Sequence, residues 1–135
     1  MIIAVDFDGT CVTHEFPYVG KEIGAAEVLK ELTDKGHKII LFTMRSHPEE
    51  INQKGIAYSD ALQDAIDWFK KYDIPLFGVN ENPTQKGWTS SPKPYAHIYI
   101  DDAALGVPLK KDSLSERPYV DWGIVKYYLH VKNIL

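Results

Sequence analysis

The first ten residues constrain the fold more than any other stretch, because they join an apolar strand to two closely spaced carboxylates. The first five residues are all apolar, and they are followed by Asp6-Phe7-Asp8-Gly9-Thr10. A short unbroken apolar run is typical of a strand buried on both faces of a parallel sheet. Gly9 predicts a turn where this strand ends. Two acids at the end of a buried strand repel each other, and a hard divalent cation such as Mg²⁺ relieves that repulsion.

Strands and helices alternate along the rest of the chain. We expect further strands over 38–43, 76–79 and 96–100, and a short edge strand over 106–109. We expect helices over 22–35, after the N-cap Ser59 and before Pro75, and after the N-cap Asp121. This alternation predicts an α/β fold, a mostly parallel sheet with helices on both faces. The 135 residues suit a single domain, 1–135.

Polar side chains follow three of the predicted strands. Asp6 and Asp8 end the first strand, Thr43 ends the second, and Asp101 and Asp102 end the strand over 96–100. The carboxyl ends of parallel strands meet at one edge of a sheet, and ligands bind there. Carboxylates and a hydroxyl at one edge indicate a site for a metal ion and a phosphate group.

The motif Asp6-Phe7-Asp8-Gly9-Thr10 resembles the first motif of the haloacid dehalogenase superfamily, and Thr43 and Asp101-Asp102 resemble its second and fourth motifs. The resemblance implies a three-layer, Rossmann-like fold. It also implies that Asp6 is a nucleophile that forms an aspartyl-phosphate and that Asp8 is the general acid and base. Asp6, the backbone carbonyl of Asp8, Asp101 and, less directly, Asp102 would hold Mg²⁺, and Thr43 would bind the phosphoryl group.

The third motif of that superfamily is a phosphate-binding lysine. Lys93 is the expected residue, since Lys93-Pro94 precedes the strand over 96–100, and Lys86 is the alternative. Arg45, just after Thr43, is expected either to bind a substrate phosphate or carboxylate or to form a surface ion pair.

Neither connection that could hold a cap domain is long enough to do so. Residues 11–21 and 80–92 are too short to form a core of their own, so the chain resembles a member without a cap domain. An open site admits a phosphorylated small molecule or the phosphate of a macromolecule. Loops or a partner subunit would then exclude water, and the sequence leaves open whether the protein is a homo-oligomer.

Composition narrows the function classes further. The formal charge of −4 does not favour nucleic-acid binding, and no apolar run reaches the length of a membrane span. Cys11 is the only cysteine, which fits a reducing compartment, so we expect a cytoplasmic protein. The resemblance to the haloacid dehalogenase superfamily, together with the acids at the strand ends, implies a Mg²⁺-dependent phosphomonoester hydrolase. The alternative is a non-catalytic or regulatory protein that binds phosphate or metal on the same fold.

Overall fold

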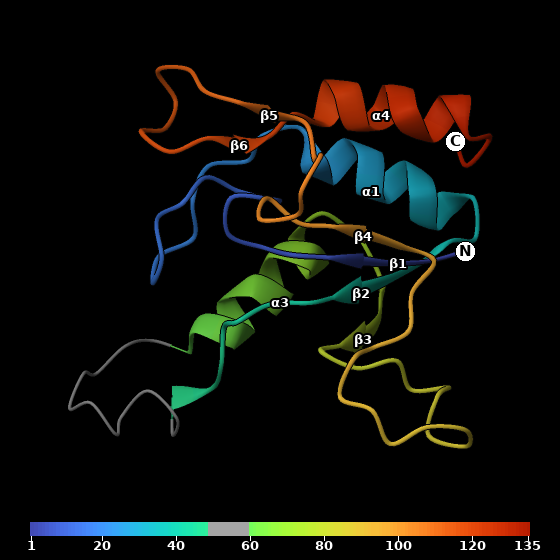
Figure 1. Cartoon of the computed structure of the whole chain (residues 1–135). Helices are drawn as coiled ribbons and strands as arrows, with labels where there is room; N and C mark the ends of the chain where they lie inside the picture. The colour runs from blue at the N-terminus through green and yellow to red at the C-terminus, as the bar shows by residue number, and fades with distance from the viewer. Residues whose placement is uncertain (49–59) are drawn as a thin grey trace.

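The structure of the chain is a computed structural model that describes residues 1–48 and 60–135. Its elements form a parallel sheet, a separate small hairpin and a set of packed helices (Figure 1). In chain order the elements are β1 (Ile2–Val5), α1 (Ala25–Asp34), β2 (Lys38–Leu41), α3 (Ala61–Lys71), β3 (Leu76–Val79), β4 (Ile98–Ile100), β5 (Leu109–Lys110), β6 (Tyr119–Val120) and α4 (Trp122–Val131).

The parallel sheet has the strand order β3-β2-β1-β4, which places β1 in its interior. Val5 of β1 lies opposite Leu41 of β2 on one side and opposite Ile100 of β4 on the other. The chain adds β2 and β3 on one side of β1 and then returns to add β4 on the other side. In open α/β sheets, ligands bind beyond the carboxyl ends of the strands at such a change of direction. The predicted parallel α/β sheet is confirmed, and the site is expected between β1 and β4.

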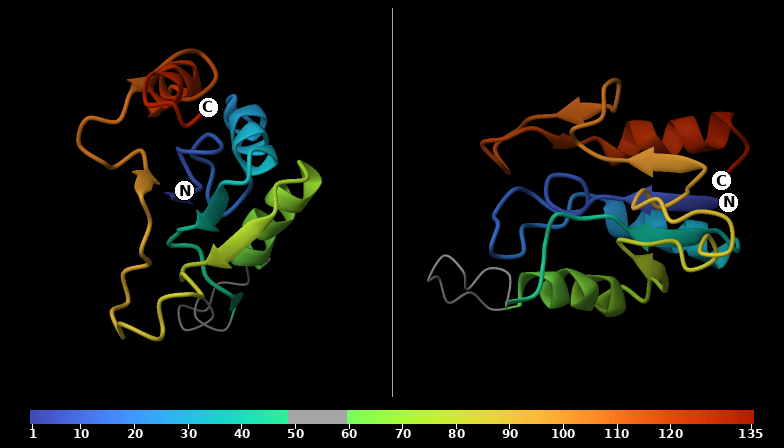
Figure 2. Two further views of the ribbon diagram at one scale, coloured as in Figure 1. Left: turned by 90° about the vertical axis from the view of Figure 1, so that its right-hand side faces the viewer. Right: turned by 60° about the horizontal axis from the view of Figure 1, so that its bottom comes forward.

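The two faces of the sheet are covered differently. Ile3 and Ile39 belong to a large buried cluster to which α1, α3 and α4 all contribute. Ala4 and Ile40 point to the other face, where they form a smaller cluster with Ala96, from the segment that links β3 to β4. Figure 2 shows α1 and α3 on one side of the sheet and this linking segment on the other.

The second face has no helix in the described ranges, in contrast to the helices predicted on both faces. The connection from β3 to β4 contains Pro83, Gly87, Pro92 and Pro94. Proline and glycine disfavour a helix, because proline lacks an N–H group and glycine loses the most backbone entropy. The connection therefore crosses this face as irregular chain (Figure 2).

Acidic side chains begin the helices. The Glu22 carboxylate accepts hydrogen bonds from the backbone N–H groups of Gly24 and Ala26, at the start of α1. Glu22 itself lies outside the helix, which begins at Ala25, three residues later than predicted. Asp60 caps α3, and the predicted cap Ser59 lies outside the described residues. Asp121 caps α4, as predicted. None of the helices in the described ranges has the length and apolar character needed to cross a membrane.

The predicted edge strand over 106–109 is wrong in its bounds, and the strand that forms there is not an edge of the main sheet. β5 begins at Leu109, which pairs with Val120 of β6 in an antiparallel hairpin separate from the main sheet. Each strand has only two residues, too few for an alternating pattern to show in the sequence. The hairpin lies beyond the carboxyl ends of the main sheet (Figure 1).

Candidate functional site

The candidate site begins where β1 ends. The backbone N–H of Asp6 donates to the carbonyl of Ile100 at 2.9 Å, which extends the pairing of β1 with β4 by one residue. Asp101 and Asp102 follow Ile100 directly. One carboxylate from β1 and two from β4 therefore meet where the strand order changes, with oxygen atoms that all lie within 4.8 Å of one another. Asp6, Asp101 and Asp102 are named the carboxylate cluster below.

A tight turn carries the chain away from the end of β1. The backbone N–H of Thr10 donates to the carbonyl of Phe7 at 3.1 Å, and the Phe7 ring is buried in the core. Gly9 has a φ of 78°, and a Cβ atom there would collide with the side chains of His14 and Asp102. Glycine is needed at this position both for the backbone conformation and for the space.

The half-buried position of the carboxylate cluster disfavours the charged form of Asp6. Burial, together with the weaker effect of the charges of Asp101 and Asp102, raises the pKa of Asp6 from its ordinary value of 3.8 to about 7. The hydrogen bond from Thr10 acts in the opposite direction. Without a cation, the cluster therefore holds a proton near neutral pH.

Thr10 links the two halves of the cluster, a role that sequence reasoning missed. Its hydroxyl donates to Asp6 Oδ2 at 2.8 Å and accepts from the backbone N–H of Asp102 at 3.0 Å. The Thr10 carbonyl accepts a hydrogen bond from Trp122 Nε1 of α4 at 2.6 Å. The signal was present in the sequence, because Thr10 is the last residue of the motif that contains Asp6 and Asp8.

His14 borders the cluster from the loop after the turn. Its Nε2 atom lies 2.9 Å from Asp102 Oδ2, and both side chains are largely buried. His14 thus forms one wall of the site and contacts one of the two β4 carboxylates.

The carboxylate cluster has the chemistry of a site for a hard divalent cation. Mg²⁺ prefers oxygen ligands, and it usually keeps several waters besides one or two carboxylates. A cation among Asp6, Asp101 and Asp102 would offset the burial and the charge repulsion that raise the pKa of Asp6. The side chain of Asp8 is outside this cluster, so its expected metal contact depends on its backbone carbonyl alone.

The Asp8 carboxylate instead forms a two-fold hydrogen-bonded ion pair with Arg45. Arg45 Nε donates to Asp8 Oδ2 and Nη2 donates to Asp8 Oδ1, both at 2.8 Å. Its other donors reach the carbonyls of Ala61 at 3.0 Å, Tyr18 at 2.8 Å and Pro17 at 3.4 Å. All five N–H donors of a guanidinium are thus used.

Arg45 therefore differs from both roles that the sequence suggests for it. It is only 3% exposed, so its ion pair is not on the surface. Its guanidinium lies 4.9 Å from the centre of the Phe7 ring and 5.3 Å from that of Phe16. With every donor used inside the protein, Arg45 has none for a substrate in this arrangement, and it is a positioning residue for Asp8.

Thr43 lies two residues beyond the end of β2, at the same edge of the sheet as Asp6. Its backbone N–H donates to Asn80 Oδ1 at 2.8 Å, and its hydroxyl oxygen accepts from the backbone N–H of Arg45 at 3.1 Å. The hydroxyl donates no hydrogen bond among the described residues, so its hydrogen is available to a bound group.

Neither candidate lysine forms an ion pair with the carboxylate cluster in the part of the chain that the structure describes. Lys93 Nζ lies 5.4 Å from the centre of the Tyr99 ring, on the face without helices. Lys86 is exposed in the connection between β3 and β4. Across residues 1–48 and 60–135, neither lysine forms an ion pair with any of the candidate acids. Among the described residues, the three acids thus meet without an ion pair to the expected lysine.

Comparison with known proteins adds one relative to this description. No family model matches the chain, and no curated protein matches it. The solved structure of a conserved protein from Bacteroides thetaiotaomicron is similar over 98% of this chain and 90% of its own, with 32% sequence identity and a TM-score of 0.70. This chain belongs to the same family as that conserved protein. The Bacteroides protein is described without an activity, so the relationship supports the fold and leaves the chemistry to be argued from the site.

Proposed function

We propose that the protein is a Mg²⁺-dependent phosphomonoester hydrolase of the haloacid dehalogenase type, without a cap domain. The observation that carries the proposal is the carboxylate cluster, where Asp6, Asp101 and Asp102 converge at the change of strand order. The parallel sheet supports membership of that superfamily. The face without helices departs from its three-layer arrangement within the described residues.

Asp6 is the proposed nucleophile. One of its oxygens attacks phosphorus, the bond from phosphorus to the leaving oxygen breaks, and an aspartyl-phosphate forms. Mg²⁺, when bound, neutralises charge on the carboxylates and on the phosphoryl oxygens. Thr10 holds Asp6 in place through the 2.8 Å hydrogen bond to Oδ2, which leaves Oδ1 for the attack.

Asp8 is the proposed general acid and base. It gives a proton to the leaving oxygen in the first step and takes one from the attacking water in the second, which releases inorganic phosphate. Arg45 holds both oxygens of Asp8 in one orientation. Each carboxylate oxygen has a further lone pair, so Asp8 can hold the transferred proton in either step while Arg45 keeps its contacts.

The substrate is a phosphorylated small molecule or a phosphate on a macromolecule. The free hydroxyl hydrogen of Thr43 would donate to a phosphoryl oxygen, and Lys93, or else Lys86, would supply positive charge. A cytoplasmic location stays a prediction.

A second candidate is a protein of the same fold that binds metal or phosphate without turnover. Two observations favour this candidate. The Asp8 carboxylate is engaged by Arg45 at both oxygens, and neither Lys93 nor Lys86 pairs with the described acids.

Hydrolysis of an aryl phosphate separates the two candidates. We expect phosphate release with Mg²⁺, none with EDTA, none for Asp6→Asn, and a rate about 10² to 10⁴ times lower for Asp8→Asn. Asp73→Asn is the matched control, because Asp73 is exposed and lies far along the chain, beyond α3. Activity that survives Asp6→Asn would contradict the mechanism. Binding of Mg²⁺ by the wild-type protein with no hydrolysis of any phosphomonoester would favour the second candidate.

A further inference from the structure

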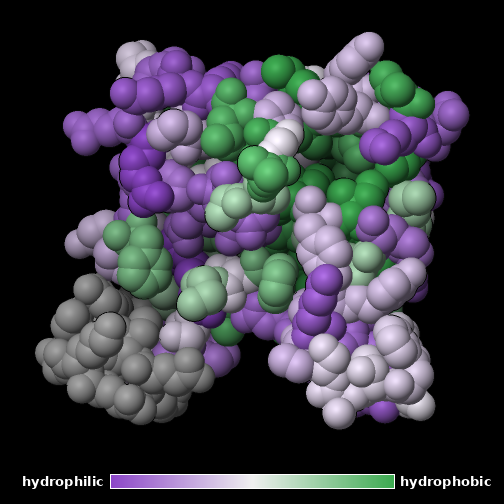
Figure 3. Space-filling model, in the orientation of Figure 1, coloured by the Kyte–Doolittle hydropathy of each residue, from purple (hydrophilic) through white to green (hydrophobic). Residues whose placement is uncertain are grey.

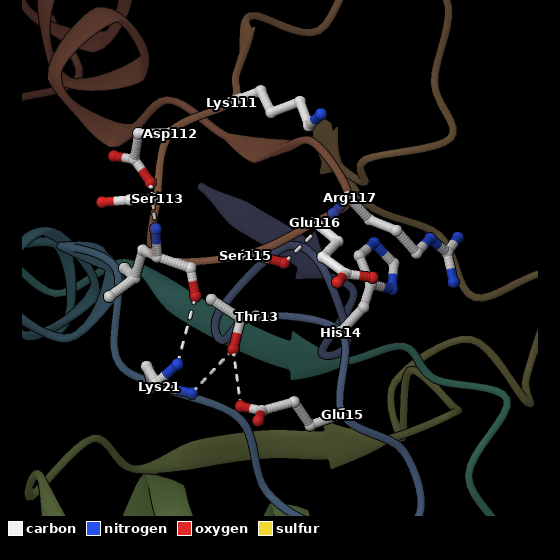
Figure 4. A pocket seen from close by; sticks show the side chains of 11 residues that line it. Thr13, His14, Glu15, Lys21, Lys111, Asp112, Ser113, Ser115, Glu116 and Arg117 are labelled. Atoms are coloured by element: carbon white, nitrogen blue, oxygen red, sulfur yellow. Dashed lines mark hydrogen bonds between the residues drawn. The ribbon is translucent and has the colours of Figure 1, made fainter.

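A cavity of about 720 Å³ lies between the loop after the first motif and the tip of the β5–β6 hairpin. Residues 13–15 and 21 line one side, and residues 111–117 line the other (Figure 4). Its size is within the range of about 300–1,000 Å³ that is usual for small-molecule sites. It is named the hairpin cavity below.

The hairpin cavity is built onto the candidate active site. The backbone N–H of Val120 in β6 donates to the carbonyl of Gly9 at 3.0 Å, which ties the hairpin to the first motif. Lys21 Nζ donates to the carbonyl of Leu114 at 3.1 Å, which ties the hairpin tip to the loop. His14 lines the cavity and also contacts Asp102 at 2.9 Å, so cavity and carboxylate cluster share a wall.

The walls of the hairpin cavity are polar and their formal charges cancel. Three basic and three acidic residues line it, namely Lys21, Lys111, Arg117, Glu15, Asp112 and Glu116. Hydroxyl side chains lie between them, Leu114 is the one aliphatic residue, and there is no aromatic ring apart from the imidazole of His14 among the described residues that line it. Figure 3 shows the region of the hairpin as hydrophilic surface.

Some polar side chains of this lining already form hydrogen bonds within the protein, and others are available to a ligand. Asp112 accepts a hydrogen bond from the hydroxyl of Tyr119 at 2.7 Å, and Glu15 accepts one from the hydroxyl of Thr13 at 2.9 Å. No side-chain hydrogen bond or ion pair within the described ranges uses the carboxylate of Glu116. Figure 4 shows Glu116 extending from the hairpin tip toward His14, so a free acceptor faces the side of the cavity nearest the carboxylate cluster.

We infer that the hairpin cavity holds the leaving group of the substrate and selects a neutral, polyhydroxylated one, so that the substrate is a sugar or polyol phosphate. This inference rests on the function proposed above. Hydroxyl groups can donate to Glu116 and accept from Lys111 and Arg117, and a neutral leaving group matches walls whose charges cancel. A nucleoside would gain little here, because base recognition commonly relies on stacking against aromatic side chains. A lipid chain would leave the polar lining without partners.

The test measures binding separately from turnover. Amide chemical shifts of Asp6→Asn are recorded with Mg²⁺ and either a hexose 6-phosphate, inorganic phosphate or adenosine 5′-monophosphate. We expect all three to shift signals near residues 6–10 and 101–102, and only the hexose phosphate to shift residues 111–117 strongly. Inorganic phosphate that shifts the hairpin equally, or a nucleotide that binds as tightly as the hexose phosphate, would overturn the inference.

A pair of variants sharpens this test. Glu116→Gln should weaken hexose phosphate binding about tenfold, the effect of losing a hydrogen bond to a charged group, and should leave inorganic phosphate binding unchanged. Glu81→Gln, an exposed change outside the cavity, should alter neither. If the hexose phosphate binds in this way but no phosphomonoester is hydrolysed, the proposed hydrolase function fails and the cavity assignment stands. If an aryl phosphate is hydrolysed but Glu116→Gln changes nothing, the cavity assignment fails alone.

Discussion

Replacing Asp6 by asparagine should stabilise the metal-free protein at neutral pH, although it removes the proposed nucleophile. The carboxyl of Asp6 has a pKa of about 7 in the folded chain, against an ordinary value of 3.8. One pKa unit corresponds to about 1.36 kcal/mol, so ionised Asp6 costs the folded state at most about 4 kcal/mol. Asparagine removes this cost and keeps an oxygen that can accept from the Thr10 hydroxyl.

The effect depends on pH in a defined direction. Since the folded state holds the proton more tightly than the unfolded chain, the favourable contribution of Asp6 is complete below pH 4 and is lost as pH rises toward 7. The wild-type protein in EDTA should therefore lose stability over this range relative to Asp6→Asn. Mg²⁺ should restore part of the lost stability at pH 7, because a ligand that binds the folded state stabilises that state.

Urea unfolding followed by tryptophan fluorescence measures this difference, since Trp68 and Trp122 are buried. Free energies of unfolding are taken for both proteins from pH 4 to 8 in EDTA, and the difference between the two curves isolates Asp6 from the other titrating groups. Parallel curves would refute a raised pKa for Asp6. If the wild-type protein gains stability relative to Asp6→Asn between pH 4 and 7, the pKa of Asp6 is lowered on folding and not raised.

Three further substitutions test the framework of the site. Arg45→Leu leaves the half-buried Asp8 carboxylate unpaired and should lower the free energy of unfolding by about 3–5 kcal/mol, with less loss for Arg45→Lys. Thr10→Val removes the hydrogen bond to Asp6 and should cost about 1–3 kcal/mol, and calorimetry should also show weaker Mg²⁺ binding. Gly9→Ala combines a φ of 78° with a collision against His14 and should cost more than about 2 kcal/mol.

The changes at Gly9 and Arg45 each have a control in the same chain. Gly36→Ala has a similar positive φ of 89° but no atom near the added Cβ, so it measures backbone strain without collision. Equal losses for Gly9→Ala and Gly36→Ala would contradict the close approach at Gly9. Arg117→Leu removes an exposed arginine that forms no ion pair within the described chain and should change stability by less than about 0.5 kcal/mol. An equally small effect for Arg45→Leu would contradict its role in holding Asp8.

The elements that local sequence predicts well are those with strong periodicity or clear caps. The apolar run over the first five residues correctly indicates β1, and Asp121 correctly indicates the start of α4. The start of α1 is misplaced by three residues, since Glu22 acts as a cap from outside the helix. The hairpin is missed, because strands of two residues show no period and are held by contacts distant in sequence, such as the one from Val120 to Gly9.

The sequence by itself determined a parallel α/β sheet and the acids at its carboxyl edge, because strand ends and motif spacing are local properties. Only the tertiary structure decided which of these acids meet. Asp6 joins Asp101 and Asp102 because β4 pairs with β1, whereas Asp8 turns to Arg45, which α3 and the loop after the first motif enclose. Tertiary packing also built the hairpin cavity beside them, from segments about 100 residues apart along the chain. Such partners are set by long-range packing and electrostatics, which no local pattern of residues encodes.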